Sequence, residues 1–139
     1  MLKVGMRASF SKTITETDVI LFSGISGDLN PVHINELVAE KSIFKKRIVH
    51  GCLVSGFISA VIGNKLPGEG TIYLEQNSKY IAPVYINDTL TAVVEISEIL
   101  NEKKGIYKLK TQVFNQSENM VIDGYAIVKY MEEADEKNK

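Results

Sequence analysis

The chain has 139 residues, of which 45% are hydrophobic and 24% charged, and its formal net charge is −1. This composition is typical of one globular domain, expected here over 1–130, followed by a charged and disordered tail over 131–139. The small net charge argues against nucleic-acid binding. No apolar run reaches the roughly 20 residues of a membrane span or resembles a secretory signal, so we expect a cytoplasmic protein.

The first elements are a strand and a helix. Weak alternation of apolar residues over Val4–Ile14 predicts a strand at the edge of a sheet. Thr15 followed by Asp18 resembles a capping box, and apolar residues follow it, so a helix is predicted over Glu16–Ile25.

An ordered turn is predicted next. Pro31 disfavours a helical backbone at Asn30, while Asp28 and Asn30 are able to accept hydrogen bonds from nearby backbone amides. A short helix over about Asn35–Lys41 is expected to follow. Two of its apolar side chains are predicted to point inward, Leu37 and Val38.

The run Gly51–Gly63 is apolar nearly all round, which predicts a helix buried on most sides. The chain's single cysteine, Cys52, lies in this run and is expected to be a small buried hydrophobe. It therefore offers neither a disulfide nor an activated nucleophile.

Four β-rich segments follow, separated by turn residues: Thr71–Tyr80, Thr89–Ile99, Ile106–Asn115 and Val121–Tyr130. One long apolar helix between an N-terminal strand and these four indicates an antiparallel sheet wrapped around a central helix. The predicted fold class is α+β, and the architecture is the single hot-dog fold.

Asp28 and His33 are the strongest acid–base candidates, because a turn at Pro31 allows side chains five residues apart to face one space. A carboxylate beside an imidazole is able to hold and move protons near neutral pH. On spacing alone, a capping aspartate and a structural histidine are the more common explanation, because Asp and His often fall near each other by chance. The other histidine, His50, is interpreted as structural rather than catalytic.

Gly51 begins the central helix, where backbone amides are able to stabilise a negatively charged oxygen and a missing side chain permits close approach. A glycine kept for packing alone explains the residue as well. The spacing of His, Cys and acidic residues indicates no metal cluster, and no glycine-rich phosphate loop is present.

The run from Phe22 to His33, FSGISGDLNPVH, closely resembles the signature of the (R)-specific enoyl-CoA hydratases, in the MaoC-like branch of the hot-dog proteins. The sequence IVHG at 48–51 and the small-residue helix after it resemble the family's second hallmark. Phe44, Arg47 and the loop from Leu66 to Tyr73 match as well, so that the resemblance covers about Val4–Tyr130.

The resemblance implies a role for each matching position. Asp28 and His33 would activate a water molecule, and Asp28 would exchange the proton at the α-carbon of the substrate. The amide of Gly51 would bind the thioester oxygen. The supporting or substrate-binding positions would be Asn30, which orients His33, then Ser59 or less favourably Ser55 on the central helix, and Arg47.

The implied reaction is reversible hydration of trans-2-enoyl-CoA to (R)-3-hydroxyacyl-CoA. The resemblance also implies that coenzyme A would enter as part of the acyl-CoA substrate, with no metal or redox cofactor, and that the protein would be a homodimer or a dimer of dimers. The alternatives are a (3R)-hydroxyacyl-carrier-protein dehydratase, a non-catalytic acyl-CoA-binding module and a thioesterase. Basic side chains are available to bind CoA phosphates or a carrier protein: Lys41, Lys45, Lys46 and Arg47.

Overall fold

The computed structural model describes residues 1–132, and a five-stranded antiparallel sheet is its main element. The strands are β1 (Arg7–Thr13), β2 (Ile72–Tyr80), β3 (Thr89–Asn101), β4 (Ile106–Phe114) and β5 (Met120–Lys129). Their order across the sheet is β1-β3-β4-β5-β2, which leaves β1 and β2 as the edges. The predicted strands and the N-terminal edge strand are confirmed.

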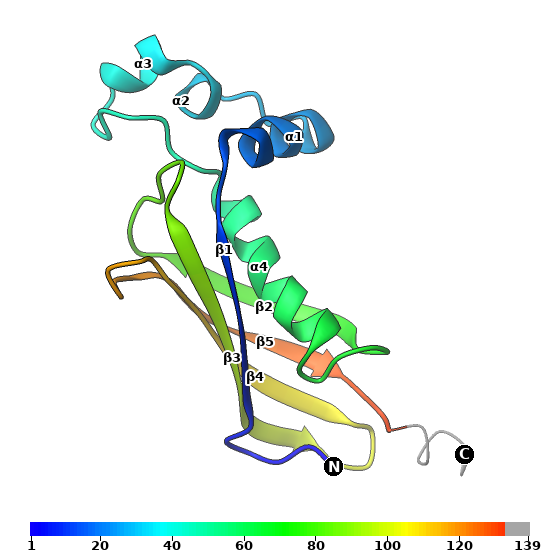
Figure 1. The fold of residues 1–139 in the computed structure, drawn as a ribbon. Helices are drawn as coiled ribbons and strands as arrows, with labels where there is room; N and C mark the ends of the chain where they lie inside the picture. Colours follow the sequence, from blue (N-terminus) through cyan, green and yellow to red (C-terminus); the bar gives the residue numbers. More distant parts are fainter. Residues whose placement is uncertain (133–139) are drawn as a thin grey trace.

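Four helices accompany the sheet: α1 (Glu16–Ser26), α2 (Pro31–Ile34), α3 (Glu36–Glu40) and α4 (Gly51–Asn64). Figure 1 shows α4 lying along one face of the sheet, with α1, α2 and α3 gathered beyond one end of it. This is the α+β hot-dog arrangement that the sequence predicted. None of the helices within 1–132 has the length and apolar character needed to cross a membrane.

The core lies between α4 and the sheet. Alternate residues of β3 are fully buried, as expected of a strand with one face covered. The side chains of α4 that meet them follow helical spacing: Val54, Ile58, Val61 and Ile62.

Two predictions about burial are wrong. Cys52 is exposed, because the sheet covers only one side of α4 and Cys52 lies on the other. Leu37 and Val38 are also exposed, at 70% and 43% of their surface. They lie on α3, which at five residues is little more than one turn, and only Ala39 faces the body of the protein.

The segment expected to be a turn contains the unpredicted helix α2. Pro31 is its first residue, where its missing N–H costs nothing, and the Asn30 side chain accepts a hydrogen bond from the Val32 amide. The pair Asn30-Pro31 is thus a local signal for the start of a helix as well as for a turn. From 133 onward, the tail predicted over 131–139 lies outside the described residues.

The predicted capping box at the start of α1 is present. Thr15 Oγ1 accepts from the Asp18 amide at 3.2 Å, and Asp18 Oδ2 accepts from the Thr15 amide at 2.9 Å. The helix ends at Ser26 and is capped by Gly27, whose backbone has φ +81 and whose amide donates to the Ser23 carbonyl. The exit of the chain toward Asp28 is thereby fixed.

We expect Thr15→Ala to lower the free energy of unfolding by about 1 kcal/mol, since one cap bond is lost. The hydrogen bond from the Lys12 ammonium, and then that from the Thr15 amide, holds the pKa of Asp18 below its ordinary value. A carboxyl group whose pKa is lowered by folding stabilises the fold at pH values above its ordinary pKa. That stabilisation is lost as the pH falls through the lowered pKa of the folded state. Urea unfolding between pH 7 and 2 measures both effects. Asp18→Asn is expected to remove this part of the acid dependence, and an unchanged pH profile in that variant would contradict the assignment.

Candidate active site

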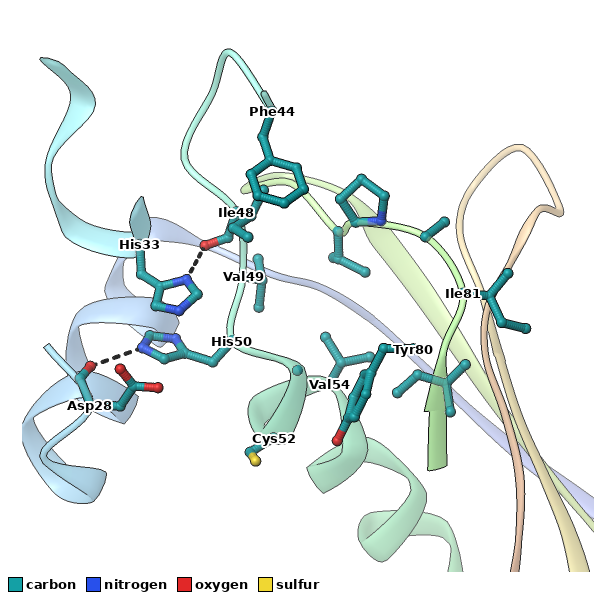
Figure 2. A pocket seen from close by; sticks show the side chains of 15 residues that line it. Asp28, His33, Phe44, Ile48, Val49, His50, Cys52, Val54, Tyr80 and Ile81 are labelled. Carbon is teal, nitrogen blue, oxygen red and sulfur yellow. Dashed lines mark hydrogen bonds between the residues drawn. The ribbon is translucent and has the colours of Figure 1, made fainter. Parts of the chain in front are cut away.

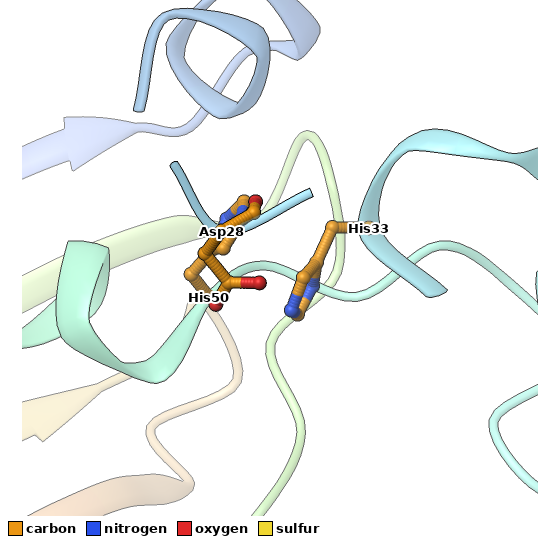
Figure 3. A group of neighbouring side chains, drawn as sticks. All are labelled: Asp28, His33 and His50. Carbon is orange, nitrogen blue, oxygen red and sulfur yellow. The ribbon is translucent and has the colours of Figure 1, made fainter. Parts of the chain in front are cut away.

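The loop after α1 presents the Asp28 carboxylate. The Asp28 amide donates to Ser26 Oγ at 3.1 Å, and Asp28 Oδ1 accepts from the Asn30 amide at 3.2 Å. These local bonds hold the loop, while the Asp28 side chain stays exposed. Figure 3 shows the carboxylate beside the His33 ring.

His33 lies on α2 and is 93% buried, with only 7% of its surface exposed. Its Nδ1 is 2.8 Å from the carbonyl oxygen of Ile48. A carbonyl only accepts hydrogen bonds, so Nδ1 carries the proton and Nε2 of the neutral ring keeps a lone pair. In Figure 2, this second nitrogen lies on the side of the ring that faces Asp28 and His50. His33 is therefore held in the tautomer of a proton or hydrogen-bond acceptor.

Asn30 and Arg47 both act on the backbone around His33. Asn30 caps α2, and its carbonyl accepts from the His33 amide at 3.0 Å. Arg47 Nε donates to the His33 carbonyl at 2.8 Å, and Arg47 Nη1 donates to Glu16 at 2.6 Å. These contacts place both residues in support of the α2 segment.

The ring of His50 stacks on that of His33, with centroids 3.8 Å apart and planes 27° from parallel. Burial lowers the pKa of His50, and the neighbouring His33 lowers it further, whereas the bond to Asp28 acts in the opposite direction. His50 is therefore neutral near pH 7. The spacing of His33 and His50 along the chain did not predict this contact.

Asp28, His33 and His50 each offer a ligand atom within 4.8 Å of the others. The prediction that no such cluster exists is therefore wrong, because it considered only spacing along the chain. Lone pairs of imidazoles lie in the ring planes, and two nearly parallel stacked rings do not direct them at one tetrahedral ion. Holding a metal would require one ring to turn.

Asp28 and His33 share a cavity of about 560 Å³ with the first turn of α4 (Figure 2). The side chain of His50 makes no cap bond to this helix, and the amides of Leu53 and Val54 donate to the His50 carbonyl. The amides of Gly51 and Cys52 are the ones that such a helix leaves without an internal acceptor. The remaining lining is mostly apolar: Phe44, Ile48, Val49, Val54, Tyr80, Ile81, Ala82, Pro83, Val84 and Ile122.

Tyr80, which the sequence reading missed, lies over Gly51. A Cβ atom at position 51 would lie 2.7 Å from Cε1 of the Tyr80 ring, closer than real Cβ contacts. The Tyr80 hydroxyl bonds to Ser55 Oγ at 3.0 Å. A side chain at position 51 would therefore displace the Tyr80 ring. Tyr80 is the last residue of β2, and its distance from Gly51 along the sequence did not indicate that the two residues are in contact.

The two serines proposed as supporting residues lie in different settings. Ser55 is half-buried and bonded to Tyr80, whereas Ser59 is exposed on α4. Ser59 follows Gly51 by about two helical turns, and it is not among the residues lining the cavity. Within this chain the structure brings Ser55, and not Ser59, to the tip of the helix.

A second cavity of about 620 Å³ adjoins Arg47 and includes Lys45 and Lys46, but not Lys41. Lys46 lies over the Tyr85 ring at 5.7 Å from its centroid. Three acidic residues line the same cavity, Glu16, Glu36 and Glu40. The expected basic patch is therefore one of mixed charge.

Comparison with known proteins agrees with this geometry. An (R)-specific enoyl-CoA hydratase from Rhodospirillum rubrum is 52% identical over 103 residues, which are 74% of this chain and 72% of that protein. The solved (R)-hydratase of Aeromonas caviae superposes with a TM-score of 0.89 at 38% identity, covering 94% of this chain and 98% of its own. An R-hydratase structure from Pseudomonas aeruginosa has the same TM-score at 42% identity, covering 95% and 84%. The family model described as "MaoC like domain" matches residues 2–118, and the chain belongs to this MaoC-like family.

Proposed function

We propose that this protein is a hydro-lyase that reversibly adds water to trans-2-enoyl-CoA and forms (R)-3-hydroxyacyl-CoA. The observation that carries the proposal is one cavity containing the Asp28 carboxylate, an acceptor nitrogen of His33 and the amide end of α4. The names of the similar hydratases support the same reaction.

In the proposed mechanism, a water molecule is hydrogen-bonded by Asp28 and by Nε2 of His33. Asp28 accepts one proton as the hydroxyl group bonds to the β-carbon, and His33 accepts a hydrogen bond from the other. The electron pair of the double bond moves toward the thioester oxygen, where the Gly51 amide stabilises the charge. Asp28 then gives its proton to the α-carbon and returns to a carboxylate. No metal or redox cofactor takes part in the proposed cycle.

The test is hydration of trans-2-enoyl-CoA thioesters of increasing chain length. The reaction is measured as the loss of absorbance of the conjugated double bond. Chiral analysis is expected to show the (R)-3-hydroxyacyl product. A rate equal to that of heat-denatured protein at every chain length would exclude the proposal. Release of free thiol without loss of the double bond would identify a thioesterase instead.

A carrier-protein dehydratase would run the same chemistry on a different thioester. Lys45 and Lys46 are exposed at the second cavity and are able to contact either CoA phosphates or an acidic carrier. Glu36 and Glu40 lie beside them and would repel the phosphates of CoA as well as the acidic residues of a carrier. Rates on matched CoA and carrier thioesters separate these functions.

We also propose that two copies pair through β2. This strand is an edge of the sheet, and its exposed side includes Ile72 and Leu74, at 55% and 52% of their surface. An open apolar edge of this kind is typically covered in a stable protein. Sedimentation equilibrium tests the dimer, and a monomer at micromolar concentration would contradict it. A CoA-dependent function is consistent with the predicted cytoplasmic location.

A further inference from the structure

His50 connects three parts of the proposed active site. It immediately precedes Gly51, its ring stacks on His33, and its Nε2 lies 3.1 Å from the carbonyl oxygen of Asp28. The same Nε2 is 3.1 Å from Ser23 Oγ, and Phe22 contacts the ring edge-to-face at 4.8 Å between centroids. With 2% of its surface exposed, the imidazole has little freedom to move.

The protonation of His50 follows from these partners. The Asp28 carbonyl only accepts hydrogen bonds, so Nε2 must carry the proton and donate it. The neutral ring then has its lone pair on Nδ1, which is buried and has no hydrogen-bond partner among the described residues. An unpartnered buried nitrogen lowers stability, and an apolar side chain would fill the space without this cost.

The position of His50 also argues against a role in helix stability alone. It occupies the N-cap of α4, where Ser, Thr, Asp or Asn normally bond the first helical amides. The His50 side chain makes no cap bond and turns back to the Asp28 loop instead (Figure 2). Its contacts therefore serve the loop and the second histidine rather than its own helix.

We propose that His50 is a positioning residue for the Asp28–His33 pair, with its N–H fixing the Asp28 backbone and its ring face fixing the orientation of His33. The inference rests on the proposed hydratase function. It does not require His50 to touch the substrate or to change protonation. Because a misplacement of about 1 Å in a catalytic group costs about 10²-fold in rate, loss of this support is measurable in kcat.

The test compares His50→Gln with His50→Asn. Both amides carry an N–H donor, but the longer Gln side chain places it near the position of Nε2, and Asn places it near Nδ1. His50→Gln is expected to retain kcat within about tenfold, whereas His50→Asn loses about 10²-fold, with KM changed by less than about threefold in both. Equal losses in the two variants, or full activity in His50→Asn, would overturn the inference.

A second readout is independent of activity. The chain contains two histidines, so in a His50 variant of the untagged protein every imidazole NMR signal belongs to His33. Nitrogen shifts are expected to report a single Nδ1–H tautomer for His33 in His50→Gln and a mixture in His50→Asn. The same pure tautomer in both variants would show that His50 does not orient His33.

Ser23→Ala provides the control for loss of stability. It removes the other partner of Nε2 from the same buried position and leaves the imidazole in place. The unfolding temperature of Ser23→Ala is expected to fall, while its kcat stays within about threefold of that of the original protein. A kcat loss equal to that of His50→Asn would mean that destabilisation explains both. An inactive unmodified protein would instead refute the proposed function.

Discussion

Asp28→Asn and His33→Asn are each expected to lower kcat for crotonyl-CoA hydration by about 10²–10⁴-fold, the range for loss of a general acid or base. An amide at position 28 is unable to accept a proton from water, although its oxygen still accepts from the Asn30 amide. Asn at position 33 offers an N–H near the place of Nδ1 for the Ile48 carbonyl and removes the acceptor at Nε2. The two substitutions therefore remove chemistry while preserving the local bonds.

Steady-state kinetics and thermal unfolding are measured together for these variants. KM is expected to change little, because neither group supplies most of the apolar contact in the cavity. Asp123→Asn, on β5 and outside the cavity lining, is the matched control and is expected to keep normal kcat. Near-normal turnover in either active-site variant would remove Asp28 and His33 from the mechanism.

The two residues are also expected to act as one unit. If the water is held by both, the double variant should lose hardly more activity than the more damaged single variant. If the loss of kcat in the double variant equalled the product of the two single losses, Asp28 and His33 would act at separate steps. The double-mutant cycle thus tests the shared water without a ligand-bound structure.

Much of the fold could be predicted because local signals repeat along each element. The β-rich composition of β3 and the capping box at Thr15 and Asp18 depend on residues close together in the sequence, and both the strand and the capping box are present. Burial was harder to predict. Cys52 is as apolar as its buried neighbours, but whether it is covered depends on which side of α4 meets the sheet. No property of the residue alone carries that information.

The site was predicted in its parts but not in its connections. Asp28 and His33 are close in sequence, so the turn at Pro31 was enough to suggest that they face one another. His50 contacts them only because Val49 pairs with Val84 and the Asp28 carbonyl meets the imidazole. These contacts come from chain segments far apart in sequence, and His50 was interpreted as an isolated structural residue for that reason.

Gly51→Ala is the second substitution with a large expected effect, a loss of about 10²-fold in kcat. A methyl group at position 51 would meet Tyr80 at 2.7 Å, at the wall of the cavity beside the first helical amides. Tyr80 is 55% exposed, so its ring is able to move aside, and the fold should lose little stability. The methyl group and the displaced ring would then keep the thioester carbonyl from the Gly51 amide.

Two explanations of that loss differ in the role of Tyr80, and Gly51→Ala/Tyr80→Ala separates them. If displacement of the ring were the whole cause, removing the ring would restore kcat to the level of Tyr80→Ala alone. We expect kcat of the double variant to stay low, because the methyl group still separates the carbonyl from the amide. Its unfolding temperature should return to that of Tyr80→Ala, since the clash is gone. Full activity in Gly51→Ala, or its recovery in the double variant, would show that the tip of α4 does not bind the reacting oxygen and that Gly51 is needed for packing alone.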